Sequence, residues 1–464
     1  MPIPVTPLQP KDGRPAIRMF CHALGDCFLI GLPHGQEIVY LAIDCGAIIG
    51  TPDSSARIQE AAQGLLDSCQ GKLNHLAVTH EHWDHVSGFL DAEEIWKKIA
   101  IETLHYAWTE DETDELANSI RDQRDRSAEV ALTALQKMTE DQKGRTLGLL
   151  GFLGVAEEGE KIGKTRQGLI KPREWVKKDN VRYWHPGQTF QISENIRLAF
   201  LGPPHDEKAL KKTSKKNQQY ALAMNEMLLG GMEMMFGMNS KGVDPDTSAP
   251  AGLPFLREGI PFEDVPKEFE GDEKILAIYK SYTDAQYRRI DHDWLKSVES
   301  LALAMDSATN NTSLAFALHL EDTDEYLLFV ADAQAGNWLS WGNQTYKVKV
   351  DGVEKDVTID EIFAKTIFYK VGHHGSHNAT MSHEGLEKMT NDKLAAMIPV
   401  DTFIAHEKKG WTEMPLEALV DRLRQKTQGR LMLLDDSADS CPPGFVRGPK
   451  SDLLNRQIYL DYYS

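Results

Sequence analysis

Residues 76–85 of the chain read Leu76-Ala77-Val78-Thr79-His80-Glu81-His82-Trp83-Asp84-His85. The apolar start belongs to the run 73–79, which has the pattern of a buried β-strand. Three histidines and one aspartate follow within six residues. An exposed loop would explain polar residues here, but it gives no reason for four metal-ligand side chains directly after a buried strand. We therefore interpret the segment as a metal-binding loop.

The residue types in this loop indicate which metals it binds. Neutral imidazole is the commonest nitrogen ligand near neutral pH, and a carboxylate adds a negatively charged oxygen. This mixture suits Zn²⁺, Mn²⁺ or iron better than Mg²⁺, which prefers oxygen ligands alone. His80 and His82 can face one ion, and Asp84 and His85 can face a second.

A second histidine cluster follows the apolar run 367–371 and reads Gly372-His373-His374-Gly375-Ser376-His377. We expect one of the paired histidines to complete the metal site. His373 is favoured because it directly follows Gly372, and His374 is the alternative. His377 is better placed to act on the substrate or on a leaving group. A histidine-rich surface turn would also produce this pattern, but that interpretation loses weight when both histidine clusters are considered together.

A third candidate is Asp332, which ends the apolar run 328–331. A carboxylate at a strand end can bridge two metal ions through its two oxygens. An aspartate at this kind of position also commonly starts a turn, so it is weak support by itself. We count Asp332 as a ligand in combination with the two histidine clusters.

The apolar patterns along the chain indicate an α/β protein. Strand-like runs alternate with helix-like periodicities, and several strands end in histidine or aspartate, where α/β enzymes build their sites. We expect strands at 18–20, 27–32, 38–43, 73–79, 196–201, 313–320, 326–331, 366–371, 397–403 and 430–434. We expect helices at 54–69, 89–99 and 415–426.

Composition places the chain among ordinary globular proteins and limits its partners. The 464 residues are 41% hydrophobic, which excludes a largely disordered or collagen-like chain. With 51 Lys and Arg against 70 Asp and Glu, the formal net charge is −19. This charge argues against coating nucleic acid through a broad basic face. It does not exclude a nuclease, because bound metal ions supply positive charge locally.

The sequence shows no signal for export or membrane insertion. No apolar run reaches the roughly 18–20 residues needed to cross a bilayer, and the polar, proline-rich start lacks the apolar core of a secretory signal. The 5 cysteines are odd in number and widely spread, which is typical of free buried thiols in a reducing compartment. We therefore expect a cytoplasmic protein that does not contact the membrane.

We expect residues 1–464 to form one large domain with two insertions. Residues 109–180 are rich in charge and mostly helical in pattern. Within residues 205–307, six of the 15 methionines lie between positions 224 and 238, and a linker rich in Gly, Pro and Ser follows them. Methionine fills irregular or adaptable surfaces. This segment is either a helical insertion packed on the core or a lid, with residues 220–240 as a surface for a protein partner.

The histidine loop also resembles a known signature. His80, His82, Asp84 and His85 match the HxHxDH pattern of hydrolases with the metallo-β-lactamase fold. The sequence around them is most similar to the subgroup typified by the metal-dependent domain of ComEC-like competence proteins. The similarity covers most of residues 18–434, and its other stretches are 25–30, 43–46, 310–314, 329–333, 370–376, 405–411 and 414–415. Those competence proteins are embedded in membranes, whereas here we expect a stand-alone hydrolase.

This resemblance implies a four-layer αββα sandwich with two divalent ions, zinc or manganese, at one edge. One ion would be held by His80 and His82. The other would be held by Asp84, His85 and the terminal histidine, with Asp332 bridging both ions. The residues that would support the metals or contact the substrate are Asp44, His374, Ser376, Lys370 and Asn310.

Many members of this family supply a third histidine to the first ion, after a mid-chain strand. The corresponding strand here ends in Gly202-Pro203-Pro204-His205, which is not a clear motif. His205 is the nearest candidate, and His292 is a weaker one. A water would otherwise complete this ion's shell.

Two neighbouring cations lower the pKa of water to about 7, which generates a hydroxide nucleophile between them. We expect Asp84 and Asp332 to fix that nucleophile. His377, Ser376 and Lys370 are candidates for contacting a phosphate or protonating a leaving group. The favoured function is a phosphodiesterase or nuclease acting on nucleic acid or a nucleotide. The alternatives are hydrolysis of a small ester, lactone or amide, and a partner-binding regulatory module with a vestigial site.

Overall fold

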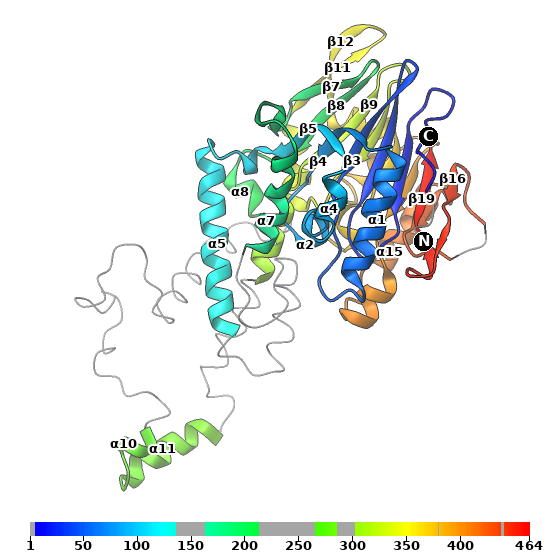
Figure 1. Ribbon diagram of the computed structural model, residues 1–464. Helices are drawn as coiled ribbons and strands as arrows, with labels where there is room; N and C mark the ends of the chain where they lie inside the picture. The colour runs from blue at the N-terminus through cyan, green and yellow to red at the C-terminus, as the bar shows by residue number, and fades with distance from the viewer. Residues whose placement is uncertain (1–4, 136–162, 213–264, 285–301, 379, 438–439) are drawn as a thin grey trace.

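The computed structural model describes residues 5–135, 163–212, 265–284, 302–378, 380–437 and 440–464 (Figure 1). In this part of the chain, the strands form two large sheets and two small two-stranded sheets, with helices between them. The α/β class predicted from the sequence is confirmed. Within the same residues, no helix combines the length and the apolar character that crossing a membrane requires.

The first large sheet has eight strands in the described residues, in the order β16-β19-β1-β2-β3-β4-β5-β6. Neighbours from β16 to β3 are antiparallel, and neighbours from β3 to β6 are parallel. The bounds are β1 (Ala16–Phe20), β2 (Phe28–His34), β3 (Glu37–Ile43), β4 (Lys72–Ala77), β5 (Ala100–Ala107), β6 (Val181–Trp184), β16 (Phe445–Arg447) and β19 (Tyr459–Tyr463).

The second large sheet has seven strands in the described residues, in the order β15-β14-β13-β10-β9-β8-β7. Neighbours from β15 to β10 are parallel, and the remaining pairs are antiparallel. The bounds are β7 (Thr189–Ser193), β8 (Ile196–Gly202), β9 (Ala315–Leu320), β10 (Glu325–Phe329), β13 (Thr366–Lys370), β14 (Ala395–Ile398) and β15 (Leu431–Leu433). The small sheets pair β11 (Thr345–Val350) with β12 (Val353–Thr358) and β17 (Lys450–Ser451) with β18 (Arg456–Gln457).

The two large sheets pack face to face through alternate residues of their strands. In β2, Phe28 and Ile30 belong to a buried cluster that contains residues of both sheets, whereas Leu29 belongs to a different cluster. This period of two follows from the strand geometry, which turns successive side chains to opposite faces. Phe28 meets Phe329 of the second sheet edge to face, with ring centroids 6.5 Å apart.

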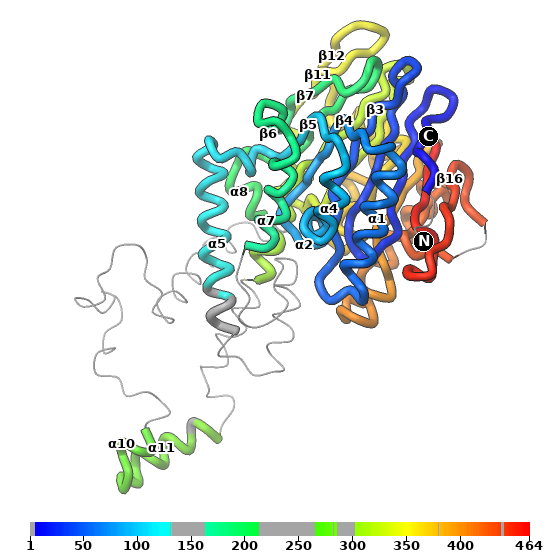
Figure 2. Tube along the Cα trace, viewed as in Figure 1, coloured from blue at the N-terminus to red at the C-terminus, as the bar shows by residue number. Residues whose placement is uncertain are grey.

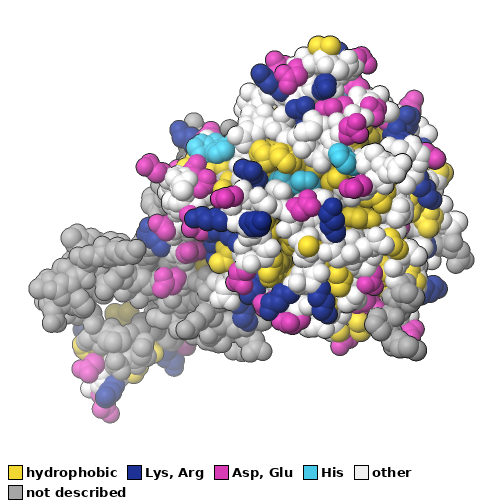
Figure 3. Space-filling model, turned by 45° about the horizontal axis from the view of Figure 1, so that its top comes forward, with side chains coloured by type: hydrophobic (Ala, Val, Ile, Leu, Met, Phe, Trp, Pro, Cys, Tyr) yellow, Lys and Arg dark blue, Asp and Glu magenta, His cyan; other side chains and the backbone are white. Residues whose placement is uncertain are grey.

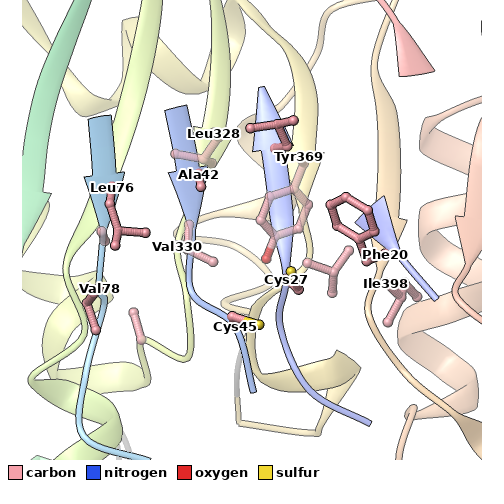
Figure 4. Close-up of a cluster of buried hydrophobic side chains, with 14 of the residues drawn as sticks. Phe20, Cys27, Ala42, Cys45, Leu76, Val78, Leu328, Val330, Tyr369 and Ile398 are labelled. Atoms are coloured by element: carbon pink, nitrogen blue, oxygen red, sulfur yellow. The ribbon is translucent and has the colours of Figure 1, made fainter. Parts of the chain in front are cut away.

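Figure 4 shows part of the other buried cluster, which includes helix residues as well as strands. Leu76 and Ala42 extend from neighbouring strands of the first sheet, and Cys27 and Cys45 lie side by side near the strand ends. All five cysteines are free thiols, as predicted; four are buried, and Cys441 is partly exposed. Because Cys27 and Cys45 directly follow Asp26 and Asp44, the buried thiols fix the backbone next to both carboxylates.

Helix α1 (Ser54–Ser68) covers one face of the first sheet, and its buried residues include Ile58, Ala61 and Leu65 at helical spacing (Figure 1). The helix predicted at 89–99 is instead two short helices, α3 (Gly88–Asp91) and α4 (Glu93–Trp96). The other α-helices are α2 (Trp83–Val86), α5 (Glu115–Leu135), α7 (Lys164–Ile170), α8 (Glu207–Leu210), α10 (Val265–Glu268), α11 (Glu273–Asp284), α13 (Ala335–Ser340), α14 (Ile359–Ala364) and α15 (Glu417–Lys426). Short 3₁₀ or π segments are η1 (Trp108–Glu110), η3 (Lys171–Trp175), η4 (Lys178–Asn180), η8 (Trp341–Asn343), η9 (Gly372–Gly375), η10 (Leu386–Lys388) and η11 (Ile404–Lys408).

The two predicted insertions are described only in part. The described residues of 109–180 hold α5, α7 and short 3₁₀ segments. Within 205–307 the structure describes α8, α10, α11 and the start of a helical stretch at 302–311. The methionine group and residues 220–240, predicted as a surface for a protein partner, lie outside the described residues.

Candidate metal centre

Four strand ends bring the predicted ligands together. β3 and β4 are parallel neighbours in the first sheet, and β10 and β13 are parallel neighbours in the second. Asp44 directly follows β3, the histidine loop follows β4, Asp332 follows β10 and the paired histidines follow β13. Parallel strands end at the same edge of a sheet, so loops far apart in sequence meet there. His374 and Asp84, which are 290 positions apart, are in hydrogen-bond contact.

One group of potential metal ligands contains Asp84, His85, Asp332 and His374, all of them fully buried. His374 Nε2 lies 2.9 Å from Asp84 Oδ2, and His85 Nε2 lies 3.2 Å from Asp332 Oδ2. The separation of His374 Nε2 from Asp332 Oδ2 is 3.9 Å. Two nitrogens and two carboxylate oxygens at such distances can surround one divalent cation.

A second group contains His80, His82 and again Asp332. His80 Nε2 lies 3.1 Å from His82 Nδ1 and 4.0 Å from Asp332 Oδ2. Asp332 therefore belongs to both groups, which is the position of a residue that can bridge two neighbouring cations.

Hydrogen bonds on the outer side of the rings determine which nitrogen faces each group. The Thr79 hydroxyl donates to Asp44 Oδ2 at 2.6 Å, so its oxygen accepts from Nδ1 of His80 at 3.0 Å and leaves Nε2 facing inward. His85 Nδ1 lies 2.8 Å from Asp44 Oδ2, and His374 Nδ1 lies 2.8 Å from the carbonyl oxygen of Pro399. Outer partners of this kind orient metal-binding histidines and fix their tautomer.

The electrostatics of the cluster suit a divalent cation. Burial opposes a positive charge on His85, but the carboxylates of Asp332, Asp84 and Asp26 outweigh it and raise its pKa well above the usual range. Burial also opposes a charge on His374, whose pKa is raised by its hydrogen bond to Asp84. The buried carboxylates thus favour positive charge at both rings. Bound cations would supply that positive charge instead, and the rings would become ligands.

The structure reverses the preference between the paired histidines. His374 enters the ligand group, whereas His373, predicted as the ligand, directs Nδ1 to Ser376 Oγ at 2.8 Å. Both residues have left-handed backbone conformations, with φ values of 43° and 53°. This tight turn separates the two rings, and the backbone N–H of His373 donates to Asp332 Oδ1 at 3.0 Å. His373 therefore contacts Asp332 through its backbone.

The candidates for a third histidine ligand do not join the cluster. His205 is 44% exposed, and its Nε2 lies 2.8 Å from Asp114 Oδ2 at the start of α5. Its ring packs edge to face on Trp108, with centroids 4.3 Å apart. His205 therefore belongs to this surface pair and to neither ligand group. His292 lies outside the described residues.

The residues predicted to contact the substrate have different positions. His377 is exposed. Ser376 accepts from His373 and donates to Asn378 Oδ1 at 2.9 Å, so it positions its neighbours. Lys370 is buried beneath the cluster, where its ammonium pairs with Asp26 and lies 3.7 Å from Asp332 Oδ1. Lys370 is therefore a buried counter-charge for the carboxylates.

Two aspartates near the site were not among the predicted site residues. Asp26 pairs with Lys370 and lies 3.8 Å from His85 Nδ1. Its signal was the stretch 25–30, which was quoted only for its resemblance. Asp306, from the helical stretch 302–311, lies 3.7 Å from His82 Nε2. Asn310, one of the predicted supporting residues, donates to its second oxygen at 3.3 Å. Asp306 follows no apolar strand run, so the sequence pattern gave no signal for it.

The loop residue Glu81 connects the site to the segment 109–180. Its side chain is buried and pairs with Arg124 of α5 at 2.6 Å and with Arg166 of α7 at 3.4 Å. The hydroxyl of Thr165 also donates to it, at 3.2 Å. Helices α5 and α7 of this segment therefore contact the histidine loop through Glu81.

No protein-family model matches the chain, and a search of curated proteins found no match.

Proposed function

We propose that the chain is a metal-dependent hydrolase with two divalent cations, zinc or manganese, which cleaves phosphodiester bonds. The observation that carries this proposal is the membership of buried Asp332 in two ligand groups, one with His80 and His82 and one with Asp84, His85 and His374. A carboxylate shared in this way brings two cations close enough to act on one phosphate.

Zn²⁺ or Mn²⁺ at these groups would polarise the phosphoryl oxygens and lower the pKa of water. The chain's own residues would fix the geometry. Asp332 would fix the position of the two groups relative to each other. Asp44 would keep both His80 and His85 in the tautomer whose Nε2 faces the cluster, through Thr79 for His80 and through a direct hydrogen bond for His85. Because the ligand side chains are buried and hydrogen-bonded, they would need little rearrangement when the metals bind.

Lys409, directly after η11, supports an anionic substrate. Burial lowers its pKa, and the carboxylate of Asp84 acts in the opposite direction. It also lies 5.9 Å from the centroid of the Trp411 ring. A lysine ammonium is a compact charge that can pair with a phosphate. Elsewhere, Figure 3 shows Lys and Arg interspersed with Asp and Glu over the face it presents, so recognition of the anion would be local to this site.

The proposed function includes membership of the metallo-β-lactamase superfamily and its αββα arrangement. The two large sheets pack together, and α1 packs against the first sheet. Residues of α14 and α15 belong to the same buried cluster as residues on the outer face of the second sheet. This order of layers supports the αββα arrangement. The convergence of the HxHxDH loop with Asp332 and His374 is the second support. Together they favour a hydrolase over a binding module, because a vestigial site would not need outer hydrogen bonds on its histidines.

The test is a hydrolysis assay on bis-(p-nitrophenyl) phosphate and on single- and double-stranded DNA and RNA, with Mn²⁺ or Zn²⁺. We expect turnover that depends on the metal and falls by at least about 100-fold in Asp84→Ala, because loss of outer partners alone costs about 10- to 100-fold. Asp322→Ala is the matched control, since Asp322 is an exposed aspartate between β9 and β10. It should keep full activity.

Turnover of p-nitrophenyl esters without turnover of any phosphodiester would instead select the small-ester alternative. Equal turnover in Asp84→Ala and in the unsubstituted protein would show that the cluster is not the site of the reaction.

A further inference from the structure

The buried histidines of the cluster share one arrangement of their ring nitrogens, and in His82 the inner and outer nitrogens are exchanged. His80, His85 and His374 each direct one ring nitrogen to the ligand groups and the other to an outer acceptor. His82 directs Nδ1 toward His80 Nε2, so its outer nitrogen is Nε2. The carboxylate near this nitrogen is Asp306, with Oδ1 at 3.7 Å.

The surroundings of Asp306 fit the role of an outer acceptor. Its side chain is 12% exposed, and Asn310 Nδ2 donates to its Oδ2. Among the described residues, Oδ1 has no hydrogen-bond partner. One oxygen thus accepts from Asn310, and the other lies 3.7 Å from His82 Nε2, beyond hydrogen-bond distance.

Geometry separates this role from direct ligation. The two nitrogens of an imidazole ring point in widely different directions, so an oxygen beside Nε2 lies away from an ion bound at Nδ1. Asp306 is also not a member of the group formed by His80, His82 and Asp332. A carboxylate that accepts the outer N–H of a metal-bound histidine fixes its tautomer and strengthens it as a ligand.

We propose that Asp306 is the positioning residue of the first cation: it accepts the Nε2–H of His82 and so directs Nδ1 toward the metal. This inference rests on the metal centre of the proposed function. It assigns a role to the stretch 302–311, which carries Asp306 and Asn310 on one helical segment ahead of β9. The first cation then needs no third histidine for the orientation of its ligands.

The test measures cation binding by the full chain, using equilibrium dialysis against Mn²⁺ followed by metal analysis. The side chain in Asp306→Asn has one acceptor oxygen for the N–H groups of both Asn310 and His82. Its amide NH₂ therefore faces the N–H of one of these two residues and cannot accept from it. We expect the free Mn²⁺ concentration that half-fills the first site to rise about 10- to 100-fold, while the second site is unchanged. Asp306→Glu keeps the carboxylate and should recover part of the loss.

Asp114→Asn is the matched control, because Asp114 also pairs with a histidine, His205, outside the ligand groups. It should bind Mn²⁺ like the unsubstituted protein. The visible absorption of the Co²⁺-loaded protein distinguishes the roles: a positioning residue leaves the band intensity at saturation unchanged, because no ligand is lost. Unchanged affinity in Asp306→Asn, or an altered Co²⁺ spectrum, would overturn the assignment.

The inference and the proposed function can fail separately. If the protein bound two cations but hydrolysed no phosphodiester, the proposed function would be overturned. The affinity measurement would then still decide the role of Asp306. An unsubstituted protein that binds no divalent cation would overturn both.

Discussion

At the scale of single residues, hydrogen bonds outside the ligand cluster decide what each buried histidine can do. The Thr79 hydroxyl is committed as a donor to Asp44, which leaves it to accept from His80. Asp44 also accepts from His85. One buried carboxylate thus sets two tautomers, and we expect a change at Asp44 to disturb both proposed cation sites without removing a candidate ligand.

A separate histidine pair between the sheets makes the fold sensitive to acid. Trp184 donates to His105 Nδ1 at 2.9 Å, so His105 carries its proton on Nε2 and donates to His75 Nδ1 at 3.0 Å. Burial lowers the pKa of His75 from 6.5 to about 4, against the opposing charge of Glu102. The unfolded chain therefore binds this proton more readily between pH 6.5 and 4. Stability present above pH 6.5 is lost as the pH falls, by about 3 kcal/mol at most for this residue.

Urea unfolding of the metal-free protein at several pH values between 7.5 and 4.5 measures this effect. His75→Gln keeps an acceptor for His105 but cannot titrate, so its stability should fall less over this range than that of the unsubstituted protein. The difference between the two isolates His75 from the other buried histidines. Parallel pH dependences would show that His75 does not titrate as its burial requires.

At the scale of elements, the turn after β3 and the turn α2 hold each other in place. Asp26 N donates to Asp84 O at 3.1 Å, and Cys45 N donates to His85 O at 2.9 Å. These backbone bonds fix α2 against the ends of β2 and β3. The ligands Asp84 and His85 are therefore positioned by main-chain contacts that need a close approach.

Gly46 is the residue that permits this approach. A Cβ at Gly46 would lie 2.4 Å from the carbonyl carbon of Asp84 and 2.5 Å from His85 N. These are backbone atoms, so the whole turn would have to move. We expect Gly46→Ala to lower the free energy of unfolding by about 1–3 kcal/mol and to weaken binding of Mn²⁺ at the Asp84 group. Denaturant unfolding and equilibrium dialysis measure the two effects.

Gly342→Ala is the control, because a Cβ there would meet nothing within 4 Å. It should change neither quantity measurably. If Gly46→Ala bound Mn²⁺ normally, the backbone contacts would not be what positions Asp84 and His85.

At the scale of the whole molecule, the first and last strands of the described chain are neighbours in the first sheet. β1 pairs with β19, as Figure 2 shows where the blue start of the trace meets its red end. Arg18 of β1 makes a bidentate pair with Asp461 of β19, at 2.7 and 2.8 Å. Its guanidinium also donates to Ser68 Oγ, which links α1 to the same sheet.

This buried pair predicts that the two ends of the chain are energetically coupled. Asp461→Ala would leave Arg18, which is 1% exposed, without its carboxylate. We expect a loss of about 3–5 kcal/mol in the free energy of unfolding, measured by denaturant titration. Replacing both residues, as in Arg18→Met with Asp461→Leu, should recover most of the loss because no buried charge is left unpaired. A loss below about 1 kcal/mol in Asp461→Ala would show that Arg18 finds another partner.

Much of the fold could be predicted from the sequence because its strands are short apolar runs with clear ends. Strands were predicted at the places of β1, β2, β3, β4, β8, β9, β10, β13 and β15, and helices at α1 and α15; the strand predicted at 397–403 overlaps β14 only at 397–398. The strand β5 was not predicted, because residues 100–107 mix Glu and His with apolar positions. β19 was not predicted either, and its partner β1 lies more than 440 residues earlier.

The residues of the candidate site also fall into those that the sequence predicted and those that only the structure placed. The sequence by itself determined the types of the candidate ligands, because histidines and aspartates at strand ends are a local pattern, and the structure brings His80, His82, Asp84, His85 and Asp332 together. Only the tertiary structure decided between His373 and His374, since the choice depends on two left-handed backbone conformations that turn one ring inward. It likewise placed His205 at the surface and Asp306 beside His82. The contacts of Asp306 with His82 and of His374 with Asp84 join residues more than 200 positions apart, so they depend on how the chain packs and not on local sequence.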